Sequence, residues 1–405
     1  MTRLGDCIAY FASSTRGPSV VAELLIAALG VNAMLWRTSP AATELEEVVV
    51  DWLRQSLGLP PGFRGQILDT ASTSSFTAVL AARHRAAPQV REDGGGDSRL
   101  TSYVSEQSHS SLEKAVMAAG LGRSSVRRIP ADECFAMRVD DLRAAIAADV
   151  AAGAIPMWIG ATIGTTSTAS VDPVAEIADV AASHGAWLHV DAAYAGPAAM
   201  LPELRPRFSG WERADSIVVN PHKWLGTSLD CSVLFFRDPE PFREALSLTP
   251  AYLRSDDGGV TNLMELALPL GRRFRALKLW LLFRCVGTDR IAESLRAHIR
   301  MASGFARAIE ADPRFRLAAP VEFGTVCFRA VGGGSGDESD EINRGLLERL
   351  NRAGRVFLSH TELGGRYTLR LSIGSVHTRP TDVEAALEGL GTALDAELAE
   401  RGRSG

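Results

Sequence analysis

The sequence predicts an α/β protein with a large domain built on a mainly parallel sheet and a smaller α+β domain after it. Strand and helix signals alternate through the first two thirds of the chain. Short strands separated by helices need crossover connections, so neighbouring strands are expected to run parallel, with helices on both faces of the sheet. After Leu268 this alternation gives way to a long helical stretch with a break near Gly287, and two strands and two further helices follow. We therefore expect a large domain over residues 1–287 and a small domain over residues 288–405.

The expected helices repeat apolar side chains at helical spacing. Between residues 42 and 58, for example, Leu45, Val49 and Leu53 fall on one face, and Gly58 ends the pattern. The same reasoning predicts helices over residues 42–58, 74–86, 110–122, 173–185, 271–311 (with a break near Gly287), 340–354 and 381–400.

The expected strands are short apolar runs bounded by turn residues. They cover residues 101–106, 155–166, 186–196, 215–220 and 231–238 in the large domain, and 324–331 and 367–374 in the small one. Glycine-rich stretches at 93–99 and 332–341 are expected to be surface loops.

Composition excludes several classes of protein. The 405 residues are 46% hydrophobic and 22% charged, with 43 basic and 48 acidic side chains, so no basic face for nucleic acid is expected. The apolar runs are too short and too mixed for a membrane span, and the first residues lack the layout of a secretory signal. Five scattered cysteines without paired spacing predict neither a metal site nor a disulfide framework, which favours a cytoplasmic protein.

Two charged residues follow apolar, strand-like runs. Lys223 comes after residues 215–220, and Asp191 ends residues 186–191. A lysine held in an apolar site has a lowered pKa and becomes a nucleophilic amine. Since α/β sheets bind ligands at the carboxyl ends of their strands, both side chains are expected in one cleft. A structural ion pair between them is the alternative.

Two polar segments precede helices. The run from Ala71 to Ser75 would present backbone N–H groups and hydroxyls to an anion such as phosphate, although a serine run before a helix is more often only a cap. His109 precedes a helix in which Ser110 and Glu113 have the spacing of a capping box, which would fix the orientation of the histidine. A loop or core histidine is the alternative for His109.

These segments offer an anion site, a histidine, a carboxylate and a buried amine, the groups that pyridoxal phosphate needs in an enzyme. The motifs SHSSLEKA, WLHVDAAYAG, ADSIVVNPHKWL, DCSVLFFRD and PLGRRFRALKLW resemble those of the pyridoxal-phosphate-dependent group II amino-acid decarboxylases, in particular the aromatic-L-amino-acid decarboxylases. The similarity runs from about Tyr10 to the C-terminal helix. It implies the type I, aspartate aminotransferase-like fold and a homodimer with active sites at the subunit interface.

The resemblance implies roles for individual residues. Lys223 matches the lysine that holds pyridoxal 5'-phosphate covalently, and Asp191 matches the acid that pairs with the ring nitrogen. His109 matches the residue stacked on the ring face, close to the departing carboxylate. Tyr252, in a segment rich in Asp and Gly, matches the lid tyrosine that returns a proton to the α-carbon. The other cofactor-binding positions are Ala193 on the opposite ring face, Thr166 near the ring hydroxyl, and Ala71, Ser72, Asn220 and His222 around the phosphate.

The implied activity is decarboxylation of an L-amino acid to an amine and carbon dioxide. Tyrosine at position 252 favours this reaction, whereas relatives that form aldehydes by oxidative deamination carry phenylalanine there. The residues that match the substrate pocket are Tyr10, Phe11, Ser13, Asn32, Met34, Leu229 and Gly271. They favour an aromatic substrate, although Asn32 could serve a more polar one, and the identity of the amino acid stays open.

The N-terminus departs from the family pattern. Family members carry several tens of residues before the segment that matches residues 7–13, and those residues wrap around the partner subunit. Here Met1 lies next to the match. A non-catalytic relative that lacks this arm is therefore a further alternative.

Overall fold

The computed structural model describes residues 8–11, 14–94, 99–248, 260–332 and 336–404. The helices in these ranges are α1 (Gly17–Leu29), α2 (Pro40–Leu57), α3 (Ala71–Ala86), α4 (Val90–Asp93), α5 (Ser110–Ala118), α6 (Val139–Ala151), α7 (Val174–His184), α8 (Pro221–Trp224), α9 (Glu240–Leu246), α10 (Ala276–Cys285), α11 (Thr288–Ala311), α12 (Gly336–Arg352) and α13 (Pro380–Ser404). The strands are β1 (Arg64–Leu68), β2 (Leu100–Ser105), β3 (Val126–Ile129), β4 (Ile155–Thr162), β5 (Trp187–Asp191), β6 (Ser216–Val219), β7 (Ser232–Phe236), β8 (Phe315–Leu317), β9 (Thr325–Ala330), β10 (Ser359–Leu363) and β11 (Arg366–Ser372).

Within the described residues, the large sheet has seven strands in the order β1-β7-β6-β5-β4-β2-β3. Strands β2 to β6 run parallel, whereas β7 is antiparallel to both of its neighbours. Strand β7 follows β6 after only the four-residue helix α8 and a loop, a connection too short for a crossover that carries a full helix. The prediction of a mainly parallel sheet is confirmed, with β7 as the antiparallel exception.

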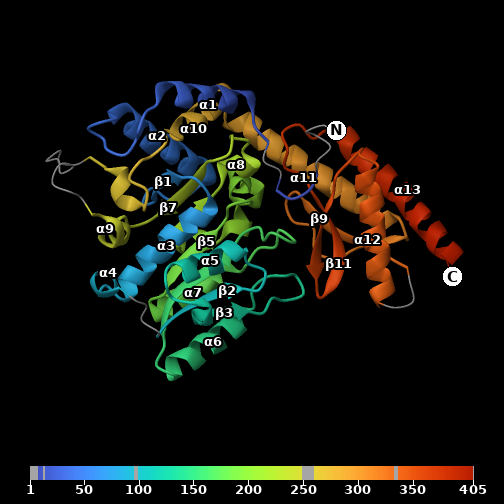
Figure 1. Cartoon of the computed structure of the whole chain (residues 1–405), viewed down its shortest axis with the longest axis horizontal. Helices are drawn as coiled ribbons and strands as arrows, with labels where there is room; N and C mark the ends of the chain where they lie inside the picture. Colours follow the sequence, from blue (N-terminus) through green and yellow to red (C-terminus); the bar gives the residue numbers. More distant parts are fainter. Residues whose placement is uncertain (1–7, 12–13, 95–98, 249–259, 333–335, 405) are drawn as a thin grey trace.

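The smaller sheet lies beside the large one (Figure 1). Helices α11 and α12 pack on this sheet, and α13 packs against both helices. In the described part of the chain the smaller sheet has four antiparallel strands in the order β10-β11-β9-β8. Helix α11 contributes to both cores, because Ile291 and Leu295 pack with the large sheet while Ala302 and Phe305 pack with the small one. The domain boundary after Gly287 therefore stays a prediction. The break in the long helical stretch does fall there, between α10 and α11.

Four strands were not predicted from the sequence: β1, β3, β8 and β10. Strand β1 shows why. Gly65 lies within it, and a Cβ at this position would come to 2.8 Å from the carbonyl oxygen of Leu234 on β7. The glycine is needed for the close approach of two strands that are far apart in sequence, which a local pattern does not reveal.

The neighbouring parallel strands β2, β4, β5 and β6 end at one edge of the large sheet. The segments at these ends carry His109, Thr166, Asp191 and Asn220 in turn. This edge is where ligands bind in open α/β sheets. None of the described helices has both the length and the hydrophobicity to cross a lipid bilayer.

Candidate active site

A cavity of about 210 Å³ lies at this edge of the sheet. Its lining consists of Phe11, Thr70, Ala71, Ser72, His109, Ser111, Thr162, Gly164, Thr166, Asp191, Ala193, Tyr194, Asn220, His222 and Lys223. Every residue predicted to bind the cofactor is among them, so the structure brings the whole set together. Tyr252 lies outside the described residues.

Lys223 lies in α8, the short helix that follows β6. Burial lowers the pKa of its amine, the charge of Asp191 raises it, and the guanidinium of Arg370 lowers it further, with a net downward shift. In the described part of the chain, no hydrogen bond or ion pair engages the amine, which lies 5.3 Å from the ring centroid of Phe11. The amine is therefore available to a ligand, and the alternative of a Lys223–Asp191 ion pair is wrong.

Asp191 is the last residue of β5 and is buried, with 6% of its surface exposed. Its Oδ1 accepts a 3.0 Å hydrogen bond from the backbone N–H of Ala193. Among the described residues, no protein group donates to Oδ2. A carboxylate with one fixed oxygen and one open oxygen at the cavity wall suits a cationic ring N–H.

His109 is the N-cap of α5, and its Nδ1 accepts a 3.2 Å hydrogen bond from the backbone N–H of Ser111. Since Nδ1 accepts, the neutral ring carries its proton on Nε2. The expected capping box is wrong, because Glu113 instead pairs with Arg123 and Arg128. The histidine side chain does the capping itself, which fixes the ring more directly than the predicted box would.

The anion end of the cavity is formed by the first turn of α3 and by the segment before α8. The backbone N–H groups of Ala71 and Ser72 find no acceptor in the described residues, as expected at a helix start. Nδ1 of His222 accepts from the backbone N–H of Cys231 at 2.9 Å. Burial, with a smaller effect from the Lys223 charge, lowers the pKa of His222 to about 4, so its neutral ring presents Nε2–H as a donor.

Asn220 provides an observation that points to a ligand. Its Oδ1 is buried without a hydrogen-bond partner in the described residues. Buried polar atoms are seldom left unsatisfied. Because Oδ1 is an acceptor, it suits a hydrogen-bond donor and not a phosphate oxygen. The free helix amides, the unpaired amine and the open carboxylate together fit pyridoxal 5'-phosphate, with its phosphate, aldehyde and ring nitrogen.

Of the residues predicted for the substrate pocket, only Phe11 lines this cavity. Asn32 is engaged elsewhere, because its Oδ1 accepts from the backbone N–H of Arg272 at 2.8 Å and its Nδ2 lies 3.2 Å from Met34 Sδ. Leu229 is exposed, and Ser13 lies outside the described residues. The structure of a single chain therefore gives no support for a role of Asn32 in binding a polar substrate.

Arg370 was not predicted. It is buried on β11, with Nε donating to the Ser167 carbonyl at 2.9 Å and the guanidinium 4.7 Å from the Phe11 ring centroid. Its Nη2 finds no partner in the described residues. The alternation of Thr368, Arg370 and Ser372 with leucines showed that Arg370 lies on the polar face of a strand. The sequence did not show that this face is directed towards the large domain and not towards solvent.

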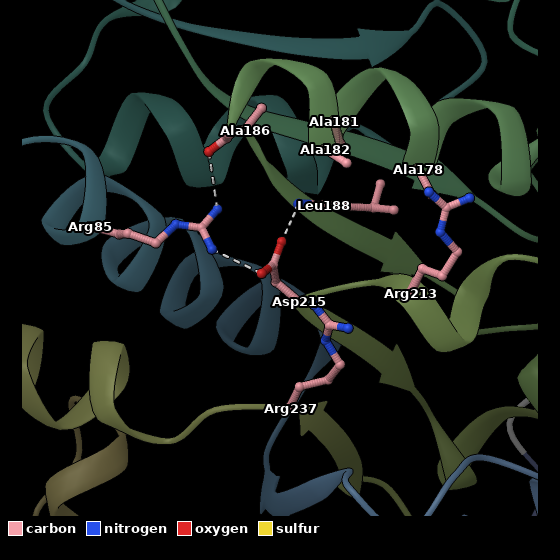
Figure 2. A pocket seen from close by; sticks show the side chains of 10 residues that line it. Arg85, Ala178, Ala181, Ala182, Ala186, Leu188, Arg213, Asp215 and Arg237 are labelled. Atoms are coloured by element: carbon pink, nitrogen blue, oxygen red, sulfur yellow. Dashed lines mark hydrogen bonds and ion pairs between the residues drawn. The ribbon is translucent and has the colours of Figure 1, made fainter.

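A second cavity, of about 340 Å³, lies at the opposite ends of β5 and β6 (Figure 2). Arg85 pairs there with Asp215 at 2.8 Å, and the other carboxylate oxygen accepts from the backbone N–H of Leu188. Arg213 pairs with Asp179 outside the lining. None of the predicted site residues belongs to this cavity.

Comparison with known proteins agrees with the geometry. The model of the pyridoxal-dependent decarboxylase conserved domain matches residues 4–331. The chain belongs to the pyridoxal-dependent decarboxylase family. It is thus a pyridoxal-phosphate-dependent carboxy-lyase with the type I fold, as the resemblance implied.

Among the relatives of this decarboxylase is tryptophan decarboxylase 1 of Oryza sativa subsp. japonica, 40% identical over 402 residues that cover 94% of this chain and 78% of the relative. Phenylacetaldehyde synthase of Arabidopsis thaliana is 38% identical over 390 residues, covering 93% and 79%. The crystal structure of Oryza sativa TDC with PLP and tryptamine superposes with a TM-score of 0.94 at 38% identity, covering 98% of this chain and 85% of that one.

Proposed function

We propose that this decarboxylase removes the α-carboxyl group of an aromatic L-amino acid and releases the amine and carbon dioxide, with pyridoxal 5'-phosphate bound covalently to Lys223. The observation that carries the proposal is that Lys223 and Asp191 line one cavity without an ion pair between them in the described residues. Lys223 therefore remains available to the aldehyde of the cofactor, and Asp191 remains available to its ring nitrogen.

The bound cofactor supplies a ring that accepts the electron pair left on the α-carbon when carbon dioxide departs. Asp191 would hold a proton on the ring nitrogen. His109, with its proton on Nε2, would lie against the ring face and close to the leaving carboxylate. Lys223, with its lowered pKa, would provide a neutral amine for the aldehyde carbon.

The phosphate would be held at the start of α3. The backbone amides of Ala71 and Ser72 and Nε2–H of His222 are donors that line the same cavity, and the side-chain NH₂ of Asn220 would add a further donor. A helix N-terminus favours an anion through its free N–H groups and its dipole. Thr166 would lie near the ring hydroxyl and Ala193 against the second ring face, where a small side chain leaves space.

Two observations support an aromatic substrate. Relatives in this family are named for tryptophan and tyrosine decarboxylation. Phe11 also lines the cavity and stacks on Tyr194, with ring centroids 3.7 Å apart and an interplanar angle of 14°. An aromatic wall of this kind favours an aromatic side chain by stacking and by burial of apolar area.

The chain allows a sharp test of cofactor attachment, because it contains three lysines, Lys114, Lys223 and Lys278. Purified protein is incubated with pyridoxal phosphate, reduced with borohydride and analysed by peptide mapping. We expect the reduced cofactor on Lys223, and its loss in Lys223→Arg but not in the matched control Lys114→Arg. Label on Lys114 or Lys278 alone would contradict the assignment.

The substrate class is tested by a screen of amino acids for carbon dioxide release. We expect the highest kcat/KM with tryptophan, tyrosine or phenylalanine and no carbon dioxide release by Lys223→Arg. A preference for acidic or aliphatic amino acids would contradict the aromatic assignment while leaving the decarboxylase assignment intact.

Oxidative formation of an aldehyde is the second candidate, because phenylacetaldehyde synthase is among the relatives. Both reactions release carbon dioxide, but only the oxidative one produces hydrogen peroxide and ammonia. Tyr252 favours the amine, since the resemblance assigns it the proton returned to the α-carbon. Equal yields of peroxide and carbon dioxide would favour the aldehyde.

A homodimer is also proposed, and α1 supports it. Ala22 and Ile26 pack inward against the core, whereas Val20, Leu24 and Leu29 are 56%, 69% and 60% exposed. Exposed apolar side chains gathered on one helix mark an interaction surface. Light scattering is expected to give a dimer for the wild type and a smaller species for Leu24→Glu, with the equally apolar surface change Val150→Glu as control. A monomeric wild type would contradict the proposal.

A cytoplasmic location remains a proposal from cysteine usage. Cys134, Cys231, Cys285 and Cys327 are free thiols. Burial raises the pKa of Cys231 and of Cys327 to about 12, so these two are unreactive. Fractionation of cells that express the tagged chain tests the location.

A further inference from the structure

Helix α3 is attached to the large sheet by polar contacts near both of its ends. Near its C-terminus, Arg85 pairs with Asp215, which precedes β6 (Figure 2). Near its N-terminus, Ser74 Oγ lies 2.9 Å from Ser232 Oγ on β7. The next residue, Ser75, has its Oγ 3.1 Å from Nε2 of His189 on β5. These serines lie one turn after Ala71 and Ser72, which line the cavity.

His189 is at the centre of a fully buried hydrogen-bond network. Nε1–H of Trp187 donates to Ser216 Oγ at 2.8 Å, and the same oxygen lies 2.9 Å from Nδ1 of His189. Trp158 stacks on the histidine ring, with centroids 5.6 Å apart. Since His189, Ser75 and Ser216 have no exposed surface, bulk water does not contact the network.

Two arrangements of protons fit the network, because a serine oxygen can accept two hydrogen bonds and donate one. In the first, Ser216 donates to Nδ1 of His189 and Nε2–H donates to Ser75; in the second, Nδ1–H donates to Ser216 and Ser75 donates to Nε2. In both arrangements His189 bonds to Ser75 and to Ser216. Burial lowers the pKa of His189 to about 4, and the nearby charge of Asp191 opposes this shift, so the ring is neutral at physiological pH.

His189 lies between the acid that would bind the ring nitrogen and the helix end that would bind the phosphate. His189 and Asp191 are two residues apart on β5 and so point to the same face of the sheet. Asp191 lines the cavity where the cofactor's ring nitrogen would lie, while the Ser75 contact leads to the helix end where the phosphate would lie. One rigid side chain thus connects the strand that carries the acid with the helix that carries the anion site.

We propose that His189 is a positioning residue that fixes the first turn of α3 through Ser75 and thereby sets the place of the cofactor phosphate relative to Asp191. This inference rests on the proposed function, since it takes the start of α3 as the phosphate site. A residue that only filled space in the core would affect stability but not cofactor affinity in the folded protein.

A double-mutant cycle on cofactor binding tests the proposal. His189→Phe keeps a ring against Trp158 but removes both hydrogen bonds, and Ser75→Ala removes the hydroxyl that bonds to Nε2 of His189. Each is expected to weaken pyridoxal phosphate binding about tenfold, since each leaves a buried polar group without its partner. The double variant is expected to bind no more weakly than the weaker single variant, because both changes remove the same bond.

Thr77→Val is the matched control. Thr77 has a buried hydroxyl on the same helix, which donates to the Thr73 carbonyl at 2.8 Å and contacts no other hydrogen-bonding group of the described residues. The affinity of the Thr77→Val variant for pyridoxal phosphate is expected to stay within about twofold of the wild type. An unchanged affinity of His189→Phe for pyridoxal phosphate would overturn the proposal. It would also be overturned if the double variant lost affinity by the product of the two single losses.

A second measurement does not require that any variant binds the cofactor. The imidazole ¹⁵N shifts of the wild type, with the His189 signals identified by their loss in His189→Phe, report the tautomer directly. We expect a neutral ring with one protonated nitrogen and no titration between about pH 5 and 8, although an unperturbed histidine titrates at about 6.5. A ring that titrates in this range would overturn the inference, because it would not be held in the buried network. A wild type that fails to bind pyridoxal phosphate would instead contradict the proposed function.

Discussion

The indole Nε1 of Trp224 donates a 3.0 Å hydrogen bond to Nδ1 of His298, and both side chains are buried. Trp224 directly follows Lys223 in α8, while His298 belongs to α11, the helix shared by both cores. Tyr194 stacks on Trp224, with ring centroids 4.9 Å apart. The reactive amine is therefore attached to a helix end that is itself fixed to the rest of the molecule.

Trp224→Phe is expected to destabilise the protein by about 1–3 kcal/mol, because it leaves Nδ1 of His298 buried without its donor. Urea unfolding measures the change. Trp36→Phe is the matched control, since Nε1 of Trp36 donates to Glu44 at an exposed site, and it is expected to cost less than about 0.5 kcal/mol. Equal stability of Trp224→Phe and the wild type would show that the bond contributes nothing net.

Stability is expected to fall with pH below about 6.5, the ordinary histidine pKa. Burial lowers the pKa of His189, His222 and His298 to about 4 each, so the unfolded chain binds protons on these groups before the folded chain does. Asp172 opposes this trend, because burial raises its pKa to about 6 and the folded state binds that proton first.

A net difference of about two protons between pH 6 and 5 corresponds to a loss of about 3 kcal/mol per pH unit. The free energy of unfolding in urea, measured at several pH values without cofactor, tests this slope. A flat profile across the interval would mean that the three histidines are not buried in the neutral form.

Two substitutions at His109 separate its two roles. Asparagine is a good N-cap and retains the acceptor for the Ser111 N–H, whereas phenylalanine retains a ring without the cap. Both variants are expected to form amine at least about 100-fold more slowly, because neither has the Nε2–H proton. Only His109→Phe is expected to lose about 1 kcal/mol of stability. A wild-type rate in His109→Asn would exclude a catalytic role.

Arg370→Gln is expected to move the pH midpoint of cofactor attachment upward. Burial is the main cause of the lowered Lys223 pKa, and the Arg370 charge adds to it, so removal of the charge raises the pKa and reduces the neutral amine. The visible absorbance of lysine-bound cofactor, followed against pH, gives the midpoint. Arg296→Gln removes a surface charge paired with Glu203 and is expected to leave the midpoint in place.

Tyr252→Phe is expected to lower the yield of amine per carbon dioxide released and to raise the yields of peroxide and ammonia. The reason is that phenylalanine cannot return a proton to the α-carbon, which leaves that carbon open to oxygen. Chromatography of the amine beside a peroxide assay measures both products. An unchanged amine yield would remove Tyr252 from the mechanism.

Much of the candidate site could be predicted from the sequence because its residues lie in short segments whose spacing is set by strand and helix lengths. Lys223 and His109 each follow a strand-like run and Asp191 ends one, and parallel strands bring such ends to one edge. Arg370 could not be found in this way. It comes from the second sheet, and only the packing of that sheet beside the first directs its side chain towards Phe11.

The same distinction holds for local structure. Apolar periodicity predicted α2 and its end at Gly58, because that helix buries one face along its own length. It did not predict that His109 rather than Ser110 caps α5, since the choice depends on how the ring is held at the cavity edge.

The amino-acid sequence by itself determined the alternation of strands and helices, the order of the reactive groups and the family, because these depend on neighbours along the chain. Tertiary structure alone decided the direction of β7, the pairing of β1, the burial that lowers the Lys223 pKa and the network around His189. The physical reason is that hydrogen bonding between strands and exclusion of water both depend on residues distant in sequence, and neither exists until the chain has folded.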